Sequence, residues 1–249
     1  MGMRQLLVVA LVASPASCFP FTDRHQQRAI RIPPIPCRED FADAAERYFK
    51  KLGRAAEIGV YRGFFSRHNL ATWSGQYAMI DWWAKRNKSA FEDATVDNFM
   101  NGDDRKIAEE NVRAYGDRVT FVKALSLDAA THFPSEYFDW LYVDALHTYD
   151  AVMADLRAWW PKLRDGGLFS GDDYGDEQDT PFVKAKRWST YYGSVAKMSH
   201  WGTIRAVQAF AEEVDRQLFV TWMRPGKNKS TISSMGTGCY SWPAWYIIK

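Results

Sequence analysis

The chain has 249 residues, of which 47% are hydrophobic and 25% are charged, as in a globular protein large enough to bury one sizeable core. Its 32 basic and 30 acidic side chains leave a net charge of +2, so the composition does not predict a nucleic-acid-binding surface. Aromatic residues make up 15% of the chain, which favours a packed interior over disorder.

The N-terminus has the pattern of a targeting segment. Arg4 precedes an apolar run, Leu6–Ala13, and small residues follow at Ala16–Cys18. The run is far shorter than the roughly 20 residues of a membrane span. We therefore expect residues 1–18 to direct the chain to the secretory pathway or outside the cell, with a short buried helix as the alternative. The segment from Phe19 onward is basic and acid-poor, and it resembles the bipartite plastid-targeting presequences of algae with secondary plastids.

Residues 19–37 contain four prolines and are expected to be a linker, with one folded domain over residues 38–249. Asn87 and Asn228 begin glycosylation sequons, which fit a secretory route weakly. Removal of the signal would leave Cys37 and Cys239, which either pair or stay as two buried thiols.

Strands and helices are expected to alternate along the domain. Helical spacing is found over residues 41–52, 64–73, 105–115, 149–163 and 204–214, with a short helix or turn at 128–132. Short apolar runs predict seven strands, at residues 55–60, 77–80, 119–123, 138–143, 168–170, 218–222 and 244–248.

This order predicts a doubly wound α/β fold with a mostly parallel sheet and helices on both faces. The run 138–143 is the clearest buried strand, and Asp165-Gly-Gly167 is expected to end the helix before the fifth strand. No helical pattern separates the last two strands, which predicts a C-terminal antiparallel hairpin.

A glycine-containing loop, Glu57–Gly63, follows the first predicted strand. Glycines such as Gly59 and Gly63 let the backbone approach a ligand at the carboxyl end of a parallel strand. The spacing is not that of a dinucleotide-binding loop, and a tight turn is the alternative. Asp81 closes the second strand, where a carboxylate can accept the hydroxyls of a ribose; the alternative is a loop cap.

Three further acids follow the fourth and fifth strands. Asp144 closes the fourth strand, and the pair Asp172-Asp173 follows the fifth. Because the carboxyl ends of parallel strands share one edge of a sheet, these carboxylates are expected to converge and to suit Mg²⁺ or a similar divalent ion. His147 is a candidate general base. The alternatives are separate solvated acids and a structural histidine.

These residues together resemble the class I S-adenosylmethionine (SAM)-dependent methyltransferases, especially the small metal-dependent O-methyltransferases of the catechol and macrocin types. The resemblance covers about residues 38–249 and is most specific in Ala56–Gly63, Tyr77–Trp82 and Phe138–Tyr174. It implies a Rossmann-like, seven-stranded sheet.

The resemblance also assigns roles. It places the methionine part of SAM at Glu57, Gly59 and Gly63, the ribose at Asp81, and the adenine beside Ser126. It implies that the metal is held by Asp144, Asp172 and Asp173. Catechol-type enzymes carry a catalytic lysine where this chain has His147, and often Asn where it has Asp173. Both departures favour an acceptor other than a catechol.

We therefore expect methyl transfer from SAM to a hydroxyl of a small-molecule acceptor, assisted by Mg²⁺, with His147 and Asp144 as catalytic residues. The aromatic segment 174–200 is expected to cover the acceptor. Three alternatives stay open: a metal-independent methyltransferase, a non-catalytic SAM-fold binding protein and a nicotinamide-dependent oxidoreductase. The acceptor is not identified, and a homodimer is left open.

Overall fold

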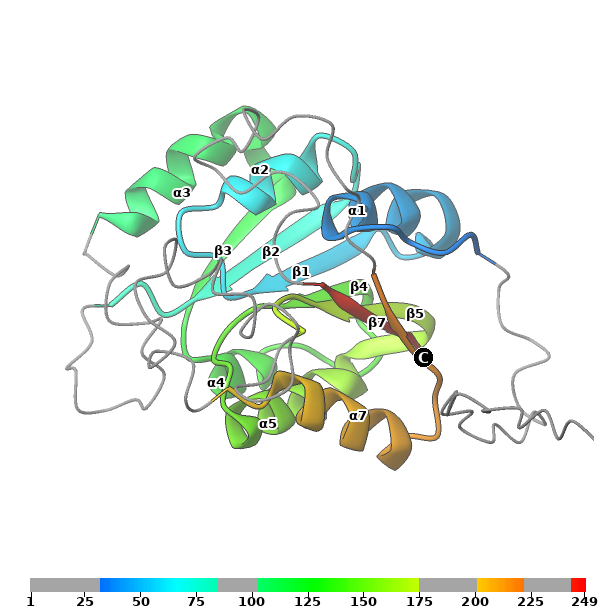
Figure 1. Ribbon diagram of the computed structural model, residues 1–249. Coiled ribbons are helices and arrows are strands. Elements are labelled where there is room, and N and C mark those ends of the chain that lie inside the picture. Colours follow the sequence, from blue (N-terminus) through cyan, green and yellow to red (C-terminus); the bar gives the residue numbers. More distant parts are fainter. Residues whose placement is uncertain (1–31, 85–102, 175–200, 222–242) are drawn as a thin grey trace, which may run out of the picture.

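A seven-stranded sheet lies between two layers of helices in the computed structural model, which describes residues 32–84, 103–174, 201–221 and 243–249 (Figure 1). The strands are β1 (Arg54–Ile58), β2 (Gln76–Asp81), β3 (Val119–Lys123), β4 (Phe138–Val143), β5 (Leu163–Gly171), β6 (Leu218–Val220) and β7 (Trp245–Ile248). The α-helices are α1 (Phe41–Ala44), α2 (Phe64–Leu70), α3 (Asp104–Val112), α4 (Ser126–Ala130), α5 (Tyr149–Trp159) and α7 (Thr203–Glu213). Shorter helical segments are η2 (Arg38–Asp40), η3 (Ala45–Phe49), η5 (Arg113–Arg118) and η6 (Trp160–Lys162).

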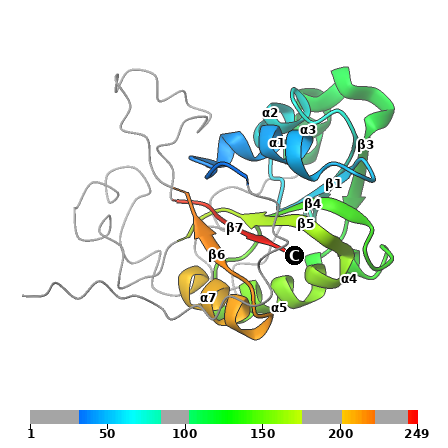
Figure 2. The same ribbon diagram turned by 90° about the vertical axis from the view of Figure 1, so that its right-hand side faces the viewer.

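The strand order is β3-β2-β1-β4-β5-β7-β6. β1 to β5 pair in parallel, whereas β7 is antiparallel to both β5 and β6. The predicted doubly wound sheet with a C-terminal antiparallel pair is therefore confirmed. Figure 2 shows α7 beneath β6 and β7, at the end of the sheet away from β3.

The fifth strand begins earlier than predicted. β5 starts at Leu163, opposite Phe138 of β4, and the register shifts before Leu168 pairs with Trp140. Asp165-Gly-Gly167 therefore lies in an irregular part of this strand rather than after a helix. Gly166 has φ +68°, a conformation that glycine adopts without a Cβ penalty.

Two hydrophobic cores fill the spaces between sheet and helices. Helices α1, α2 and α3 cover one face of the sheet, and α4, α5 and α7 cover the other (Figure 1). Successive strand residues point to opposite faces, so each central strand contributes to both cores. In β4 all six residues are buried, as the sequence predicted. Trp140 packs in the core on the side of α1, α2 and α3, and Leu141 packs in the core on the side of α4, α5 and α7.

Asp139 is the single charged residue of β4, and its hydrogen bonds link the amino ends of β1, β4 and β5. Its Oδ2 accepts the backbone N–H groups of Leu52, Gly53 and Arg54 at 2.8, 2.6 and 3.3 Å. Its Oδ1 accepts Nε of Arg164 at 2.5 Å. A fully buried carboxylate is tolerated only with such partners, so this network fixes the start of β1 against β4 and β5.

The carboxyl ends of four strands meet in register. Ile58 of β1 lies opposite Ile80 of β2 and Val143 of β4, and Val143 lies opposite Gly171 of β5. The residues that follow these strand ends therefore lie along one edge of the sheet, where ligands bind in open α/β folds.

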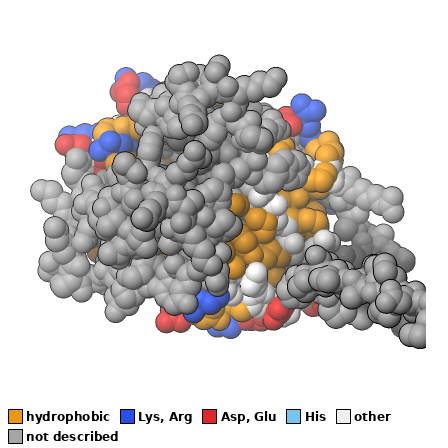
Figure 3. Space-filling view, viewed as in Figure 1, with side chains coloured by type: hydrophobic (Ala, Val, Ile, Leu, Met, Phe, Trp, Pro, Cys, Tyr) orange, Lys and Arg blue, Asp and Glu red, His pale blue; other side chains and the backbone are white. Residues whose placement is uncertain are grey.

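The end of the expected linker packs against β7. Ile35 is buried, and its N–H donates to the hydroxyl of Tyr246 in β7 at 3.4 Å, so the folded part begins before residue 38. Cys37 is disulfide-bonded, but its partner lies outside the described residues, and a pair with Cys239 stays a prediction. Hydrophobic side chains remain visible over β7 and beside α1 (Figure 3).

Several expectations fall outside the described residues: the targeting segment, both sequons, and residues 175–200 of the expected acceptor cover. Among the helices that the structure describes, none is long and apolar enough to cross a membrane.

Candidate functional site

The loop after β1 touches the loop after β4. Gly59 has φ +90°, and a Cβ built there would lie 1.8 Å from the backbone oxygen of Asp144. Gly63 has φ +70° at the start of α2, where a Cβ would lie 3.1 Å from Cε of Met79 and 3.2 Å from Cα of Ala108. Both glycines are thus required by the packing of the chain itself, and Gly59 brings the expected cofactor loop against Asp144.

Asp81 holds this glycine loop in place. Its Oδ2 accepts the N–H groups of Val60 and Tyr61 at 2.9 and 2.8 Å, and its Oδ1 accepts that of Trp83 at 2.9 Å. A carboxylate has about four acceptor positions, so three are used and one is left for a ligand. The expected ribose contact stays a prediction, with loop support as a second role.

Glu57 lies under α2. Its Oε2 accepts the hydroxyls of Ser66 and Tyr77, both at 2.8 Å. Burial raises the pKa of Glu57 to about 8 and outweighs these two hydrogen bonds, so the side chain is mostly neutral at pH 7. The side chain supports the glycine loop from within the core.

Ser126, expected beside the adenine, hydrogen-bonds toward α5. Its Oγ accepts Nε1 of Trp159 at 2.9 Å and also bonds Asp155. Burial raises the pKa of Asp155 to about 7 despite that bond. The hydroxyl of Ser126 is therefore already engaged, and the expected adenine contact stays a prediction.

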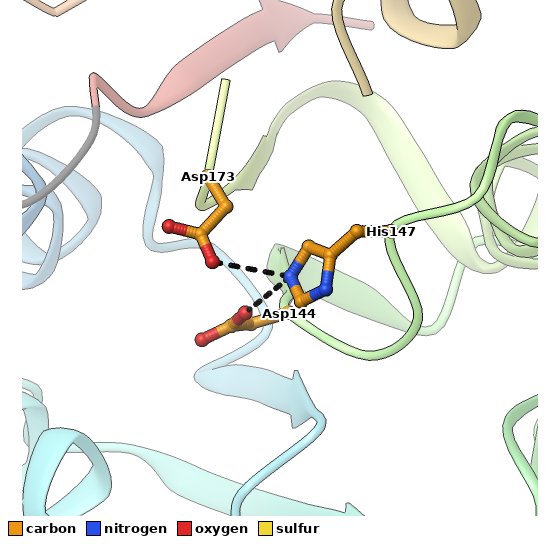
Figure 4. A group of neighbouring side chains, drawn as sticks. All are labelled: Asp144, His147 and Asp173. Carbon is orange, nitrogen blue, oxygen red and sulfur yellow. Dashed lines mark ion pairs between the residues drawn. The ribbon is translucent and has the colours of Figure 1, made fainter. Parts of the chain in front are cut away.

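Asp144, His147 and Asp173 converge at the sheet edge (Figure 4). Nε2 of His147 lies 3.6 Å from Oδ1 of Asp144 and 3.2 Å from Oδ2 of Asp173. One donor atom from each residue lies within 4.8 Å of the others. The imidazole side chain is only 12% exposed, whereas the carboxylates of Asp144 and Asp173 are 30% and 22% exposed, so a ligand can reach them.

Trp201 holds His147 in this position. The two rings stack with centroids 4.5 Å apart and planes inclined by 21°. The N–H of Gly202 donates to the backbone oxygen of His147 at 2.8 Å, and a Cβ on Gly202 would lie 2.8 Å from Cβ of Tyr149. Trp201 was not predicted as a site residue, because no spacing in the sequence links it to His147.

Asp172 does not join this group. Its carboxylate forms an ion pair with Arg38 of η2. The guanidinium also lies 3.2 Å from Oε1 of Glu39 and 5.0 Å from the ring centre of Phe65. Burial would by itself lower the pKa of Arg38, but Tyr142 and the neighbouring carboxylates raise it above its ordinary value. Arg38 was also missed by sequence reasoning, since it lies 134 residues from Asp172.

Comparisons with known proteins agree with this picture. Residues 56–174 match a family model described as a methyltransferase domain. Among curated proteins, none matches the sequence of this chain. A solved structure from Corynebacterium glutamicum has a TM-score of 0.55 and 13% identity, covering 87% of this chain and 82% of that one.

Two further solved structures share the fold. A putative O-methyltransferase from Nostoc punctiforme has a TM-score of 0.53 and 11% identity, covering 85% of this chain and 55% of that one. The O-methyltransferase from Bacillus cereus in complex with SAH has a TM-score of 0.50 and 14% identity, covering 87% and 84%. Together with the family match, these structures confirm the resemblance to class I methyltransferases.

Proposed function

Because the chain carries a methyltransferase domain on a class I fold, we propose that it transfers a methyl group from SAM to a hydroxyl oxygen of a small-molecule acceptor. The contact between Gly59 and Asp144 carries this proposal. It joins the loop expected to hold SAM to the group of Asp144, His147 and Asp173, so a methyl donor and an acceptor bound there would be neighbours.

The glycine loop and the end of β2 fit SAM. Gly59 and Gly63 let the loop pack closely against the loop after β4 and against α3, and Glu57 supports it from the core. Asp81 retains an acceptor position for a ribose hydroxyl. We assign these four residues to cofactor binding, with Ser126 near the adenine.

The carboxylates of Asp144 and Asp173 fit a divalent ion such as Mg²⁺. They lie on two neighbouring loops and both are partly exposed, and hard oxygen donors of this kind suit such an ion. Without a cation between them, the two negative charges would repel one another. When bound, the ion would polarise the acceptor hydroxyl.

His147 is the candidate general base. The acceptor oxygen would attack the methyl carbon of SAM as the carbon–sulfur bond breaks, and the hydroxyl proton would pass to Nε2 of His147. The carboxylates of Asp144 and Asp173 would then stabilise the imidazolium, while Trp201 keeps the ring oriented. Positioning of donor and acceptor supplies much of the rate.

Calorimetry with SAM, S-adenosylhomocysteine and NAD⁺ tests the cofactor first. We expect the two adenosyl compounds to bind and NAD⁺ not to bind. Transfer of the labelled SAM methyl group to a panel of phenols, sugars and other hydroxyl compounds then identifies the acceptor class. His147→Ala should lower turnover by about 10²-fold or more, whereas His132→Ala, at an exposed position in the turn that ends α4, should not. Absence of SAM binding would refute the proposed function.

We also propose, from the sequence, that residues 1–18 direct the chain into the secretory pathway, with a plastid as the alternative destination. Sequencing the N-terminus of the mature protein and locating a fluorescent fusion would decide between the two destinations.

A further inference from the structure

Arg38 and Asp172 form an ion pair across the carboxyl edge of the sheet. Asp172 follows β5, and Arg38 belongs to the segment that precedes α1. The side chains are 2% and 17% exposed for Asp172 and Arg38. A carboxylate this buried needs a cationic or hydrogen-bonding partner, and the guanidinium of Arg38 supplies it.

Strand geometry explains why neighbouring acids have different partners. Side chains alternate between the two faces along β5. Ser170 bonds Trp140 in the core beneath α1 and α2, and Asp172, two residues later, lies toward Arg38 on that same side. Asp173 takes φ +48° and lies against His147 instead.

The pairing with Arg38 leaves Asp172 incompletely satisfied. Among the residues that the structure describes, Oδ1 of Asp172 is buried and has no hydrogen-bond partner. The carboxylate therefore keeps an unused acceptor one residue away from Asp173, while its other oxygen is held by Arg38.

We propose that Arg38 is a positioning residue that keeps Asp172 out of the divalent-ion site. The ion is then held by the carboxylates of Asp144 and Asp173, and a third carboxylate can join only when Arg38 is removed. This inference rests on the ion site of the proposed function, and it assigns Asp172 a different role from the one implied by the family resemblance.

Calorimetric titration of the full chain with Mn²⁺ tests the inference without an acceptor. Asp172→Asn and Asp173→Asn each remove one negative charge with almost no change in shape. Asp173→Asn should weaken Mn²⁺ binding at least about tenfold more than Asp172→Asn does, because only Asp173 is a ligand. Equal losses would show that Asp172 also holds the ion and would overturn the inference.

The double variant Arg38→Met/Asp172→Asn removes the pair without changing the net charge. It should bind Mn²⁺ within about threefold of the wild type, whereas Arg38→Met alone should bind on the order of tenfold more tightly. Arg157→Met, which removes an exposed pair with Glu213 on the opposite face, is the matched control and should leave binding unchanged.

The outcomes separate this inference from the proposed function. Unchanged binding in Arg38→Met, or a tenfold loss in the double variant, overturns the role of Arg38 and leaves SAM-dependent transfer untouched. If the wild type binds SAM but no Mn²⁺, the ion site and the role of Arg38 are both refuted. If either Arg38 variant melts too early to assay, the comparison of Asp172→Asn with Asp173→Asn still decides whether Asp172 is kept out of the ion site.

Discussion

Replacement of Gly59 by alanine tests the contact between the two loops. The residue has φ +90°, and the new Cβ would lie 1.8 Å from the backbone oxygen of Asp144. A left-handed conformation costs an L-residue about 1–2 kcal/mol. Forcing a methyl group into a packed contact costs about 1–3 kcal/mol more, so we expect a total loss of about 2–5 kcal/mol.

Gly53→Ala is the matched control. Gly53 also has a positive φ, +70°, but its Cβ would meet only Cε of Lys50 at 3.9 Å. Thermal unfolding should therefore place Gly59→Ala below Gly53→Ala by about 2–4 °C for each kcal/mol of the packing contribution. Equal melting temperatures would show that backbone approach at Asp144 does not require glycine, and the link between cofactor loop and acid would have to be abandoned.

Three further predictions follow from the buried acids and the ion site. Asp139→Ala leaves Arg164 and three backbone N–H groups without their acceptor, so urea unfolding should show a loss of about 3–5 kcal/mol. Glu57 has a folded pKa of about 8, above its unfolded value of 4.5, so the unfolded state binds fewer protons between these values and stability falls as pH rises through this window. Glu57→Gln should flatten that part of the pH–stability curve, and an unchanged slope would contradict the assignment. Removal of divalent ions with a chelator should abolish methyl transfer, and Mg²⁺ or Mn²⁺ should restore it; full activity after chelation would support the metal-independent alternative.

The fold was largely predictable because its signals are local. The apolar run of β4 and the helical spacing of α5 come directly from residue order. The order of the last strands in the sheet was not predictable, because periodicity does not show that β7 inserts between β5 and β6. The irregular part of β5 around Gly166 was also missed, because a glycine pair gives the same signal in a bulge and after a helix.

The site could be predicted only as far as the edge of the sheet. The rule that parallel strands end together brings Asp144, His147 and Asp173 to one place. The same rule also brings Asp172 to this edge, but it does not show that the carboxylate of Asp172 pairs with Arg38 while that of Asp173 lies against His147. Arg38 and Trp201 come from distant segments, and their contacts arise from tertiary packing, which leaves no local pattern in the sequence.

The position of β7 has a consequence for folding. β7 follows β6 in the chain but lies inside the sheet, paired on both sides, while β6 takes the edge. During synthesis, the edge of β5 that β7 covers stays open until residues 245–248 have left the ribosome, and β7 is the one strand that pairs with β6 in the described part of the chain. An unpaired strand edge is a template for aggregation. Loss of these four residues would therefore expose the edge of β5 and leave β6 without its partner, so β7 protects both strands at once.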